Sequence, residues 1–557
     1  MRRTSRRSSN CFMLFTVATL WIFLNSFFYQ RYLEVVSNQI FITPKIIAII
    51  ILIWIIVSSF YGSYHIVSFF FSIMSKRFGK RITKDYIRTP KVAILYPCMN
   101  DLKEKAILSL LNQDYPNYHI YILDDSTISE EQEKASRLRD RYYDISLIHR
   151  PNRRGFKAGN LNYALEQIKD SYKYFAVMDA DELIPPDFLM ETVAIAESNP
   201  EIGFVQASHR QYGDTEYGKK TGDGMDLHWS YFLPARNQFG FVYFYGHGAL
   251  IRTKACIEAG GFPEIVAEDI GVAVKMRNFG YRGYYASDII CQEEVPPTYA
   301  AWRKRNGKVI RGTLEFLATM FPLFVKSRNI SLVEKLDLMI SSSLLFLPIP
   351  FFIFVLLLHV IMPFFSNDSY SISSAWFGAS DTRYIHTSMG IFKPLWSWDT
   401  LLFTLFTIFA PLCYLAPNFI RSPFRVIRYV WKMNTIHLSG TIHTFSETFA
   451  WLFTHRAIFC VTGSKSGHSS DFSGIYIESI AGLLMLFCSA FTGSLCLAAV
   501  GLSIAIIPLL MRTNLKGWLC PILVLLPMAF ILFTFCTIPL SMLGVTGAFI
   551  GIAFMHH

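Results

Sequence analysis

Long apolar stretches lie on both sides of a charged middle section in this chain. A helix crosses a bilayer core of about 30 Å with about 20 apolar residues. Runs of that kind lie at 11–29, 46–72, 338–365, 400–418, 474–491, 493–511 and 517–538, and a shorter apolar tail at 541–555 is an eighth candidate. The section between the second and third runs is rich in charge and glycine instead. The pattern predicts a soluble domain carried between membrane helices.

Basic residues beside the apolar runs indicate the orientation of this soluble domain. They precede the first run, follow the second and follow the fourth: Arg2, Arg3, Arg6 and Arg7; Lys76, Arg77, Lys80 and Arg81; Arg421, Arg425 and Arg428. Because cytoplasmic loops are enriched in Lys and Arg, we expect a multi-pass protein of the cell membrane with its middle domain in the cytoplasm. The mixed polar and aromatic segment 419–457 is typical of interfacial helices. The expected division is paired N-terminal transmembrane helices at 1–75, a cytoplasmic domain at 76–312, and interfacial and C-terminal transmembrane helices at 313–557.

Short apolar runs alternate with helical patterns inside the middle section. The runs "KVAILYP", "YHIYILDD", "YKYFAVMDAD" and "IGFVQAS" are rich in β-branched and aromatic residues, and stretches such as 102–113 and 158–168 separate them. Strands that alternate with helices predict an α/β domain with a parallel sheet covered on both faces. In such sheets a ligand binds beyond the carboxyl ends of the strands.

Composition narrows the possible partners. Of the 557 residues 52% are hydrophobic, and the net charge is +11. Because the basic residues flank membrane runs or spread through the middle domain, the charge favours anionic lipid headgroups and phosphorylated substrates, and no nucleic acid is expected. The ten cysteines include no C-x-x-C pair and no zinc-type spacing, which indicates a reducing compartment or a lipid environment. The first run lacks a small-residue cleavage pattern, so we expect an anchor rather than a cleaved signal peptide.

Acidic residues gather where two of the predicted strands end. Asp124 and Asp125 close one run, and Asp179 and Asp181 close another. Alternate side chains of a strand point the same way, so Asp179 and Asp181 can approach one ligand. Their oxygens suit Mg²⁺ or Mn²⁺. An isolated D-x-D is more often a solvated turn or a helix cap, but the strand context and the companion cluster favour a metal site.

Several short motifs follow one another through residues 90–470. They are "YPCMND" at 96–101, "ILDDST", "RRGFKAGNLNYAL" at 153–165, "MDADE", "YGHGALIRTKACIEAGGF" at 245–262 and "VAEDIGVAVKMRNFGYRGYY" at 266–285. In this order they resemble the family 2 glycosyltransferases, specifically the membrane-integrated synthases typified by bacterial cellulose synthase and hyaluronan synthase. Two positions depart from the family pattern, since Asp101 stands in a Glu place and Ala267 in a Thr place.

The resemblance implies an α/β cytoplasmic GT-A (Rossmann-like) domain inserted between N-terminal and C-terminal transmembrane α-helices. It implies that Asp124 contacts the uridine of a UDP-sugar donor, that Asp179 and Asp181 hold Mg²⁺ or Mn²⁺, and that Asp179 and Lys157 face the diphosphate. An exposed Lys is by default only a solvated group, whereas Lys157 on its Gly-flanked turn can reach a phosphate as a point charge. Gly159 allows close packing or backbone approach to a ligand.

The acceptor side of the resemblance concerns the "AED" sequence. Asp269 would be the general base that deprotonates the acceptor hydroxyl, and Glu268 would bind the acceptor. One displacement would then invert the anomeric centre and turn an α-linked donor into a β-linked product. The alternative for Asp269 is an ordinary N-cap of the helical stretch that follows it.

The family's Q-x-x-R-W motif is altered here. When Gly312 is aligned with the glycine that follows the motif, Arg305, Lys308 and Val309 occupy the Gln, Arg and Trp places. Lys308 can still meet a diphosphate, but Val309 offers no stacking face. We expect Arg305 and Trp302 on the acceptor side, with Trp302 as the alternative stacking platform. A membrane-surface helix is the other interpretation of this stretch, and the two are compatible.

The stretch "FCVTGSKSG" at 459–467 resembles the F-x-V-T-x-K gating loop of cellulose synthase, with one extra residue before Lys465. Thr462 and Lys465 on a mobile loop could close over a diphosphate and open for product release. A random cytoplasmic loop is the alternative interpretation. The later apolar runs would form a channel, because polar polymers do not cross lipid unaided.

Together these features predict a processive, inverting, metal-dependent glycosyltransferase that builds a β-linked extracellular or capsular polysaccharide from a UDP-sugar, with UDP-glucose the expected donor, and exports it. Its expected partners are the donor, the growing polysaccharide and membrane lipids, while a homo-oligomer or an export partner stays open. One alternative is a transferase that adds a single sugar to a lipid carrier, which the altered Q-x-x-R-W motif favours. The other is a transporter with an inactive soluble domain, which the retained acidic residues oppose.

Overall fold

The computed structural model describes residues 10–37, 42–78, 88–213, 226–361, 410–427, 429, 440–457, 473–492 and 495–512. The chain forms two compact units. The first, called the α/β unit below, contains mainly Phe71–Ile340 and also takes in Glu447–Gly467. The second, called the helical unit, consists of Phe12–Phe70, Ser341–Ser446 and His468–His557.

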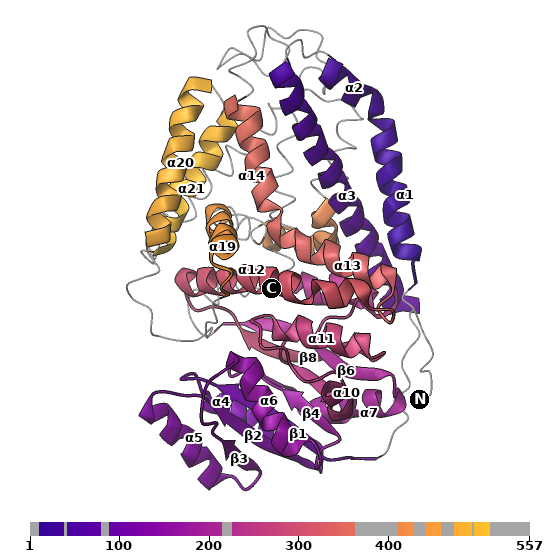
Figure 1. The fold of residues 1–557 in the computed structure, drawn as a ribbon, viewed down its shortest axis with the longest axis vertical. Helices are drawn as coiled ribbons and strands as arrows, with labels where there is room; N and C mark the ends of the chain where they lie inside the picture. The colour runs from indigo at the N-terminus through magenta and orange to yellow at the C-terminus, as the bar shows by residue number, and fades with distance from the viewer. Residues whose placement is uncertain are drawn as a thin grey trace. The chain divides into compact units, whose positions relative to one another are not determined.

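One mixed sheet of eight strands forms the centre of the α/β unit, in the order β3-β2-β1-β4-β7-β6-β8-β5 (Figure 1). The strands are β1 (Val92–Cys98), β2 (Tyr118–Asp124), β3 (Ile145–Ile148), β4 (Tyr174–Val177), β5 (Glu182–Leu183), β6 (Ile202–Tyr212), β7 (Ala249–Arg252) and β8 (Arg282–Glu294). The four runs named from the sequence became β1, β2, β4 and β6. The prediction of an α/β domain is therefore confirmed.

The expectation of a purely parallel sheet is wrong. β1, β2, β3 and β4 pair in parallel, and so do β6 and β8, but β7 is antiparallel to both β4 and β6. The connection that follows β6 includes η1 (His228–Phe232), η2 (Leu233–Ala235) and α9 (Arg236–Phe239). This excursion begins and ends at the same edge of the sheet instead of crossing over it, so β7 runs back against its neighbours.

Helices cover both faces of the sheet. They are α4 (Glu104–Leu111), α5 (Ser129–Arg141), α6 (Phe156–Ile168), α7 (Phe188–Ser198), α10 (Thr253–Glu258), α11 (Glu268–Asn278) and α12 (Tyr299–Lys326), with α13 (Leu332–Ser343) after them. Nearly every residue of β1 is buried whichever way its side chain points. Strands buried on both faces are continuously apolar rather than alternating, which is why "VAILYP" could be recognised as a central strand.

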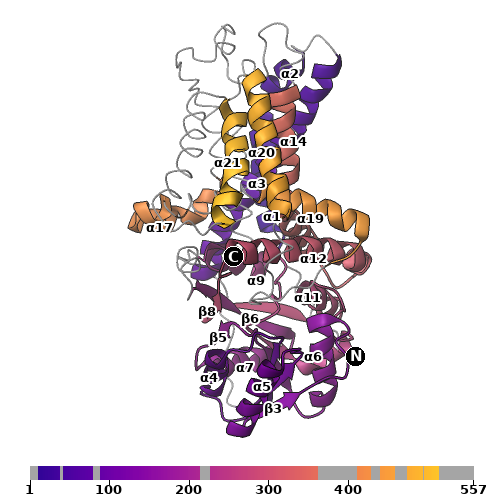
Figure 2. The ribbon, with the colours of Figure 1, turned by 90° about the vertical axis from the view of Figure 1, so that its left-hand side faces the viewer.

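The helical unit consists of helices within the described residues. They are α1 (Phe12–Phe27), α2 (Tyr29–Ser37), α3 (Ile42–Phe78), η3 (Leu344–Phe346), α14 (Pro348–Leu356), η4 (Leu357–Ile361), η7 (Ala410–Leu415), α17 (Ala416–Arg421), α19 (Thr441–Thr454), α20 (Ser473–Thr492) and α21 (Leu495–Arg512), of which α3 and α19 continue into the α/β unit. Figure 2 shows α20 and α21 side by side. A Cβ on Gly482 would lie 2.3 Å from the backbone nitrogen of Ala505, so the missing side chain lets these two helices approach closely.

Only part of the predicted membrane pattern is supported among the described residues. One helix, Lys45–Phe78, is long and apolar enough to cross a bilayer, and a bent pair, Leu332–Phe346 with Pro348–Phe354, would make a second span. Shorter apolar helices cover Phe12–Phe27 and Tyr476–Ala490. The predicted span at 400–418 is not a continuous helix in its described part, since η7 and α17 are each six residues long. The predicted runs at 517–538 and 541–555 lie outside the described residues.

Candidate functional site

The site is assembled at the carboxyl ends of β1, β2 and β4. Asp124 is the last residue of β2, and Asp179 and Asp181 follow the end of β4 directly. Because β1, β2 and β4 are parallel neighbours, these ends meet at one edge of the sheet. The sheet edge expected from the sequence is therefore the one that carries the acidic residues.

Lys157 connects the D-x-D sequence to the opposite side of the site. Its ammonium forms an ion pair with Asp179 and donates a hydrogen bond to the carbonyl of Gly246 at 3.0 Å. Burial alone would lower the pKa of Lys157, but the charges of Asp179, Glu268 and Asp269 outweigh it and raise that pKa. Lys157 is therefore a fixed cation among several carboxylates.

The turn before α6 explains how Lys157 is presented. Gly155 has a left-handed φ of +73° and a Cβ at Gly159 would lie 2.0 Å from the carbonyl oxygen of Arg154. Only a residue without a side chain lets the first turn of α6 pack against this loop. The close packing expected of Gly159 is thus present.

Asp179 and Asp181 differ in their surroundings. Burial would raise the pKa of Asp179, but Lys157 and then His247 hold it below its usual range. Burial and the neighbouring carboxylates of Asp179 and Glu293 raise the pKa of Asp181 to about 7. Two carboxylates with opposite pKa shifts therefore lie side by side here, and a bound cation would favour the ionised form of both.

Polar contacts join the loops after β1 and β2 beside Asp124. Asp124 is 2% exposed, and its Oδ1 accepts a hydrogen bond from the backbone of Ser126 at 2.9 Å. Asn100 has a left-handed φ of 60°, and its side-chain oxygen accepts from the backbone of Thr127 at 2.9 Å. Burial raises the pKa of Asp101 to about 6. Asn100 stands at the Asn place of the "YPCMND" motif, and its part in joining the two loops could have been inferred from that motif.

Asp125, next to Asp124, forms an ion pair with Arg150. Its two carboxylate oxygens accept hydrogen bonds from the Arg150 guanidinium at 2.8 and 2.6 Å, and both side chains are buried. Arg150 also donates to the carbonyls of Arg154 and Phe156. The pair therefore fixes the turn that leads to Lys157.

Asp269 lies in the first turn of α11, and Ala267 occupies the N-cap position without a side-chain cap. The alternative interpretation of Asp269 as the N-cap is therefore wrong. Burial raises the pKa of Asp269, while Lys157 and Lys308 act in the opposite direction. Burial and the charge of Asp269 raise the pKa of Glu268 to about 7. These two adjacent carboxyl groups share the field of the same two lysines.

The position of Gly246 brings the two sides of the site together. A Cβ on Gly246 would lie 3.4 Å from Oδ2 of Asp269 and 3.6 Å from Nζ of Lys157. Gly246 has a φ of +86°, which favours glycine. The carboxylate expected to act as the base and the lysine bound to the D-x-D therefore meet at one small loop.

The helix α12 carries the altered Q-x-x-R-W residues. Lys308 is close enough to influence the pKa values of Glu268 and Asp269. Arg305 forms an ion pair with Glu293 at 3.7 Å. Trp302 is 6% exposed, and its ring stacks on Tyr299 with a centroid separation of 5.6 Å. The structure thus brings Lys308 to the site, whereas it leaves little of the Trp302 ring open for a sugar.

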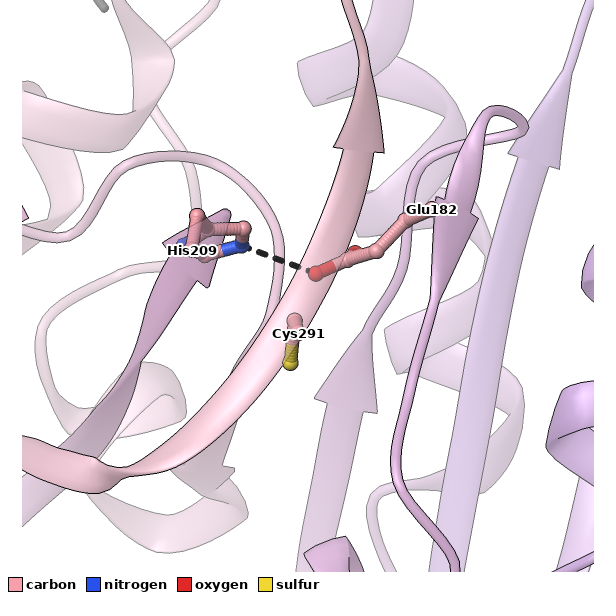
Figure 3. Close-up of side chains that lie close together, drawn as sticks. All are labelled: Glu182, His209 and Cys291. Atoms are coloured by element: carbon pink, nitrogen blue, oxygen red, sulfur yellow. Dashed lines mark hydrogen bonds and ion pairs between the residues drawn. The ribbon is translucent and has the colours of Figure 1, made fainter. Parts of the chain in front are cut away.

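A buried polar cluster lies directly behind the D-x-D sequence, and the sequence did not point to it (Figure 3). The Glu182 carboxylate accepts hydrogen bonds from Nε2 of His209 at 2.9 Å and from the backbone of Gly248 at 3.1 Å. His247 lies 3.3 Å from Glu182 and 3.3 Å from Glu293. These side chains come from β5, β6, β8 and the loop before β7, so only long-range folding brings them together.

Glu182, His209 and Cys291 each offer a ligand atom, and the three atoms lie within 4.8 Å of one another. Figure 3 shows the hydrogen bond between His209 and Glu182 in this group. Burial and then the neighbouring acidic groups raise the pKa of Cys291 well above its usual value, which favours a thiol. With the oxygens of Glu182 already accepting N–H groups, the donor set fits a hydrogen-bonded framework better than a metal site.

Thr462 and Lys465, the expected gating residues, lie outside the described residues. Their role stays a prediction.

Comparison with known proteins supports the resemblance to family 2 glycosyltransferases. The model of the family described as "Glycosyl transferase family 2" matches residues 97–260. The chain is 28% identical to "Glucomannan 4-beta-mannosyltransferase 7" of Arabidopsis thaliana over 262 residues, which cover 44% of this chain. The match spans 47% of that relative, so the chain covers about half the length of the curated protein it matches.

Solved structures with partial similarity to the chain include glycosyltransferases. A mannosyltransferase from Pyrobaculum calidifontis, solved with GDP-Man and Mn²⁺, aligns at 19% identity with a TM-score of 0.44, over 73% of this chain and 99% of that one. TarS of S. aureus aligns at 16% identity with a TM-score of 0.29, over 61% and 55%.

Proposed function

The chain contains a glycosyltransferase family 2 domain, and from this premise we propose that it is an inverting, metal-dependent membrane glycosyltransferase that makes a β-linked polysaccharide from a nucleotide sugar. The observation that carries the proposal is the meeting of Asp269, Gly246 and Lys157. A Cβ at Gly246 would be within 3.6 Å of both Asp269 and Lys157. A base for the acceptor and a cation for the departing diphosphate thus border one loop, close enough to act on opposite faces of one bound sugar in a single displacement.

Asp269 is the proposed general base. Its carboxylate would accept the proton of the acceptor hydroxyl while that oxygen attacks the anomeric carbon. The bond from the anomeric carbon to the diphosphate breaks in the same step, so the configuration inverts. Glu268 beside it would bind the acceptor. Lys308 acts on this pair by lowering the pKa of both carboxyl groups.

The proposed donor side consists of Asp124, Lys157, Asp179 and Lys308. Lys157 would hold negative charge on the diphosphate as it leaves, because its ammonium already lies among carboxylates at the end of β4. Asp124 would face the nucleobase from the end of β2. No covalent intermediate is needed, and therefore no nucleophilic side chain, because the acceptor hydroxyl attacks the anomeric carbon directly.

Asp179 and Asp181 fit a divalent cation. They are half-buried carboxylates at a strand end, and hard oxygen ligands are those that Mg²⁺ and Mn²⁺ prefer. Such an ion would supply further neutralisation of the diphosphate. Since Asp179 also contacts Lys157, the ammonium has to share that carboxylate with the ion.

We propose two candidate donor sugars. The membrane-synthase resemblance favours UDP-glucose, whereas the name of the Arabidopsis relative points to mannose. Both are α-linked nucleotide sugars that inversion would turn into β-linked products. The later apolar helices would carry the polymer across the cell membrane, where the α/β unit would face the cytoplasm.

A transferase that adds one sugar to a lipid carrier is the second candidate. It is favoured by the acceptor helix α12, in which Val309 replaces the aromatic residue of the family motif and Trp302 is 6% exposed. A processive enzyme has to hold a growing chain on a stacking face. The length of the product separates the two candidates.

The experiment uses the full chain purified into nanodiscs, with Mg²⁺ or Mn²⁺ and a panel of radiolabelled UDP-glucose, UDP-N-acetylglucosamine and GDP-mannose. We expect label from one donor in a high-mass product that Asp269→Asn abolishes. Digestion with linkage-specific glycosidases identifies the bond. Label confined to a small lipid-extractable product would support the second candidate, and no transfer from any donor would contradict both.

A further inference from the structure

His247 lies between two carboxylates in the loop that precedes β7. Its Nδ1 is 3.3 Å from Oε2 of Glu182, and its Nε2 is 3.3 Å from Oε2 of Glu293. The imidazole is 13% exposed, while both carboxylate side chains are buried. The family motifs assign no role to this residue.

Two carboxylates, each 3.3 Å from one ring nitrogen, favour the imidazolium because its positive charge then lies between two negative charges. Burial alone would lower the pKa of His247, but Glu182, Asp179 and Glu293 outweigh it and raise that pKa to about 10. The ring therefore brings a positive charge near Asp179 without replacing Lys157 as its direct partner.

The backbone around His247 holds the ring in place. Gly246 and Gly248 have φ values of +86° and +58°. A Cβ on Gly248 would lie 2.4 Å from Nε2 of His209 and 2.5 Å from Oε1 of Glu182. The fully buried Gln206 donates to the carbonyl of His247 at 2.9 Å. The loop can therefore move little without breaking this packing.

Glu293 uses its two oxygens for two different cations. Oε2 faces His247 at 3.3 Å, and Oε1 faces Nη2 of Arg305 on α12 at 3.7 Å. Glu293 is at the end of β8, only a short turn before α12 begins at Tyr299. It consequently links the His247 loop to the helix that carries Arg305 and Lys308.

We propose that His247, acting through Glu293, is a positioning residue for Arg305 and so aligns the acceptor side of the site with the donor carboxylates. The inference rests on the proposed function, since the family resemblance places Arg305 on the acceptor side of the proposed site. In this proposed role His247 contacts neither the donor nor the acceptor. Its role is to hold Glu293 in the orientation that presents Arg305.

The test compares two rates of the full chain in nanodiscs, with the active donor and Mn²⁺. One is hydrolysis of the donor without acceptor, and the other is transfer to a β-linked tetrasaccharide of the same sugar. In His247→Gln, Glu293→Gln and Arg305→Gln we expect the ratio of transfer to hydrolysis to fall about tenfold, as for loss of a charged contact. In His247→Gln and Glu293→Gln we expect hydrolysis to stay within about twofold of the unaltered chain. His119→Gln, a half-buried histidine on β2 whose ring contacts Ser146, is the matched control.

Coupling between the residues gives a second readout. Because His247 and Arg305 act through one carboxylate, the double variant His247→Gln with Arg305→Gln should resemble either single variant instead of multiplying their effects. His247→Arg keeps a cation between the carboxylates and should recover part of the transfer rate. A role confined to folding would produce neither pattern.

Three results would overturn the inference. They are an equal loss of hydrolysis and transfer in His247→Gln, an unchanged ratio in Glu293→Gln, and one bound metal ion per chain that disappears in His247→Gln. If the unaltered chain shows neither hydrolysis nor transfer with any donor, the proposed function is wrong. That result differs from the three above, so failure of the proposed function can be told apart from failure of the inference about His247.

Discussion

Lys157 is the central residue of the proposed donor site. It is the direct cationic partner of Asp179, and its ammonium also donates to the loop that borders Asp269. An exposed lysine would add little, but this one is 12% exposed and surrounded by carboxylates. Its removal would leave those negative charges facing one another at the place where an anionic diphosphate must bind.

Replacing Lys157 by Gln should lower kcat/KM for the donor by about tenfold or more, the effect expected for loss of a charged hydrogen bond at the reacting group. Initial rates over a range of donor concentrations measure the effect. Lys169→Gln, an exposed pair with Glu166 on the same segment of chain, serves as control and should stay within about twofold. An unaltered kcat/KM in Lys157→Gln would remove this residue from the donor site.

The pH dependence of the reaction tests Asp269 and Lys308 together. The base must be ionised, and burial raises the pKa of Asp269, so kcat/KM should rise with pH along a limb above the usual carboxyl range. Lys308 lowers the pKa of Asp269 in the unaltered chain. Lys308→Met should therefore move the limb to higher pH.

Lys304→Met is the matched control for this profile, since Lys304 lies one turn earlier on α12 and is not among the largest influences on the pKa of Asp269. A limb that moves to lower pH in Lys308→Met, or that moves equally in both variants, would contradict the arrangement.

At the scale of elements, α13 is attached to the α/β unit by two ion pairs. Asp337 pairs with Arg236 at 3.2 Å and also accepts from the backbone of Phe241 at 3.0 Å, and both charged side chains are fully buried. Glu334 pairs with Arg277 of α11 at 2.8 Å. These contacts fix the course of the chain after α12 and thereby support the helix that bears Arg305 and Lys308.

Asp337→Ala leaves a buried guanidinium without its carboxylate, which should cost about 3–5 kcal/mol of stability. Thermal unfolding of the detergent-solubilised chain, followed by tryptophan fluorescence, would show the loss. Glu258→Ala, which removes an exposed carboxylate paired with Lys254 at 3.8 Å, should cost less than about 1 kcal/mol. Similar melting temperatures for the two variants would show that the buried pair does not fasten α13.

Local pattern predicted strands that contain a continuous apolar run. β1, β2, β4 and β6 were found from such runs, which are typical of strands buried on both faces. The two-residue β5 is too short to leave a pattern, the four-residue β3 and β7 were not recognised, and β8 mixes polar and apolar residues. The direction of β7 depends on where the preceding connection returns to the sheet, which no local pattern encodes.

Local sequence motifs likewise predicted only part of the candidate site. The D-x-D sequence, Lys157 and Asp269 lie in contiguous motifs that could be recognised one by one. His247 and its carboxylate partners Glu182 and Glu293 become neighbours only when three strands and a loop have assembled. The one local signal for His247 is the pair of glycines around it, whose left-handed φ values indicate a constrained loop.

At the scale of the whole molecule, the chain combines an α/β unit with a helical unit in which α20 and α21 pack closely at Gly482. A helix long enough to span a membrane, Lys45–Phe78, leads from the helical unit into the α/β unit. These helices are the observed elements on which the proposed membrane location rests.

The most direct test of the central claim is the stereochemistry of the bond that the chain forms. The α-linked donor found active in the panel would be labelled with ¹³C at the anomeric carbon, and the first product examined by NMR before any rearrangement. We predict that the unaltered chain forms a β-linked product and that Asp269→Asn forms none. An α-linked product, or the same β-linked product from Asp269→Asn at an unreduced rate, would contradict single displacement with Asp269 as the base.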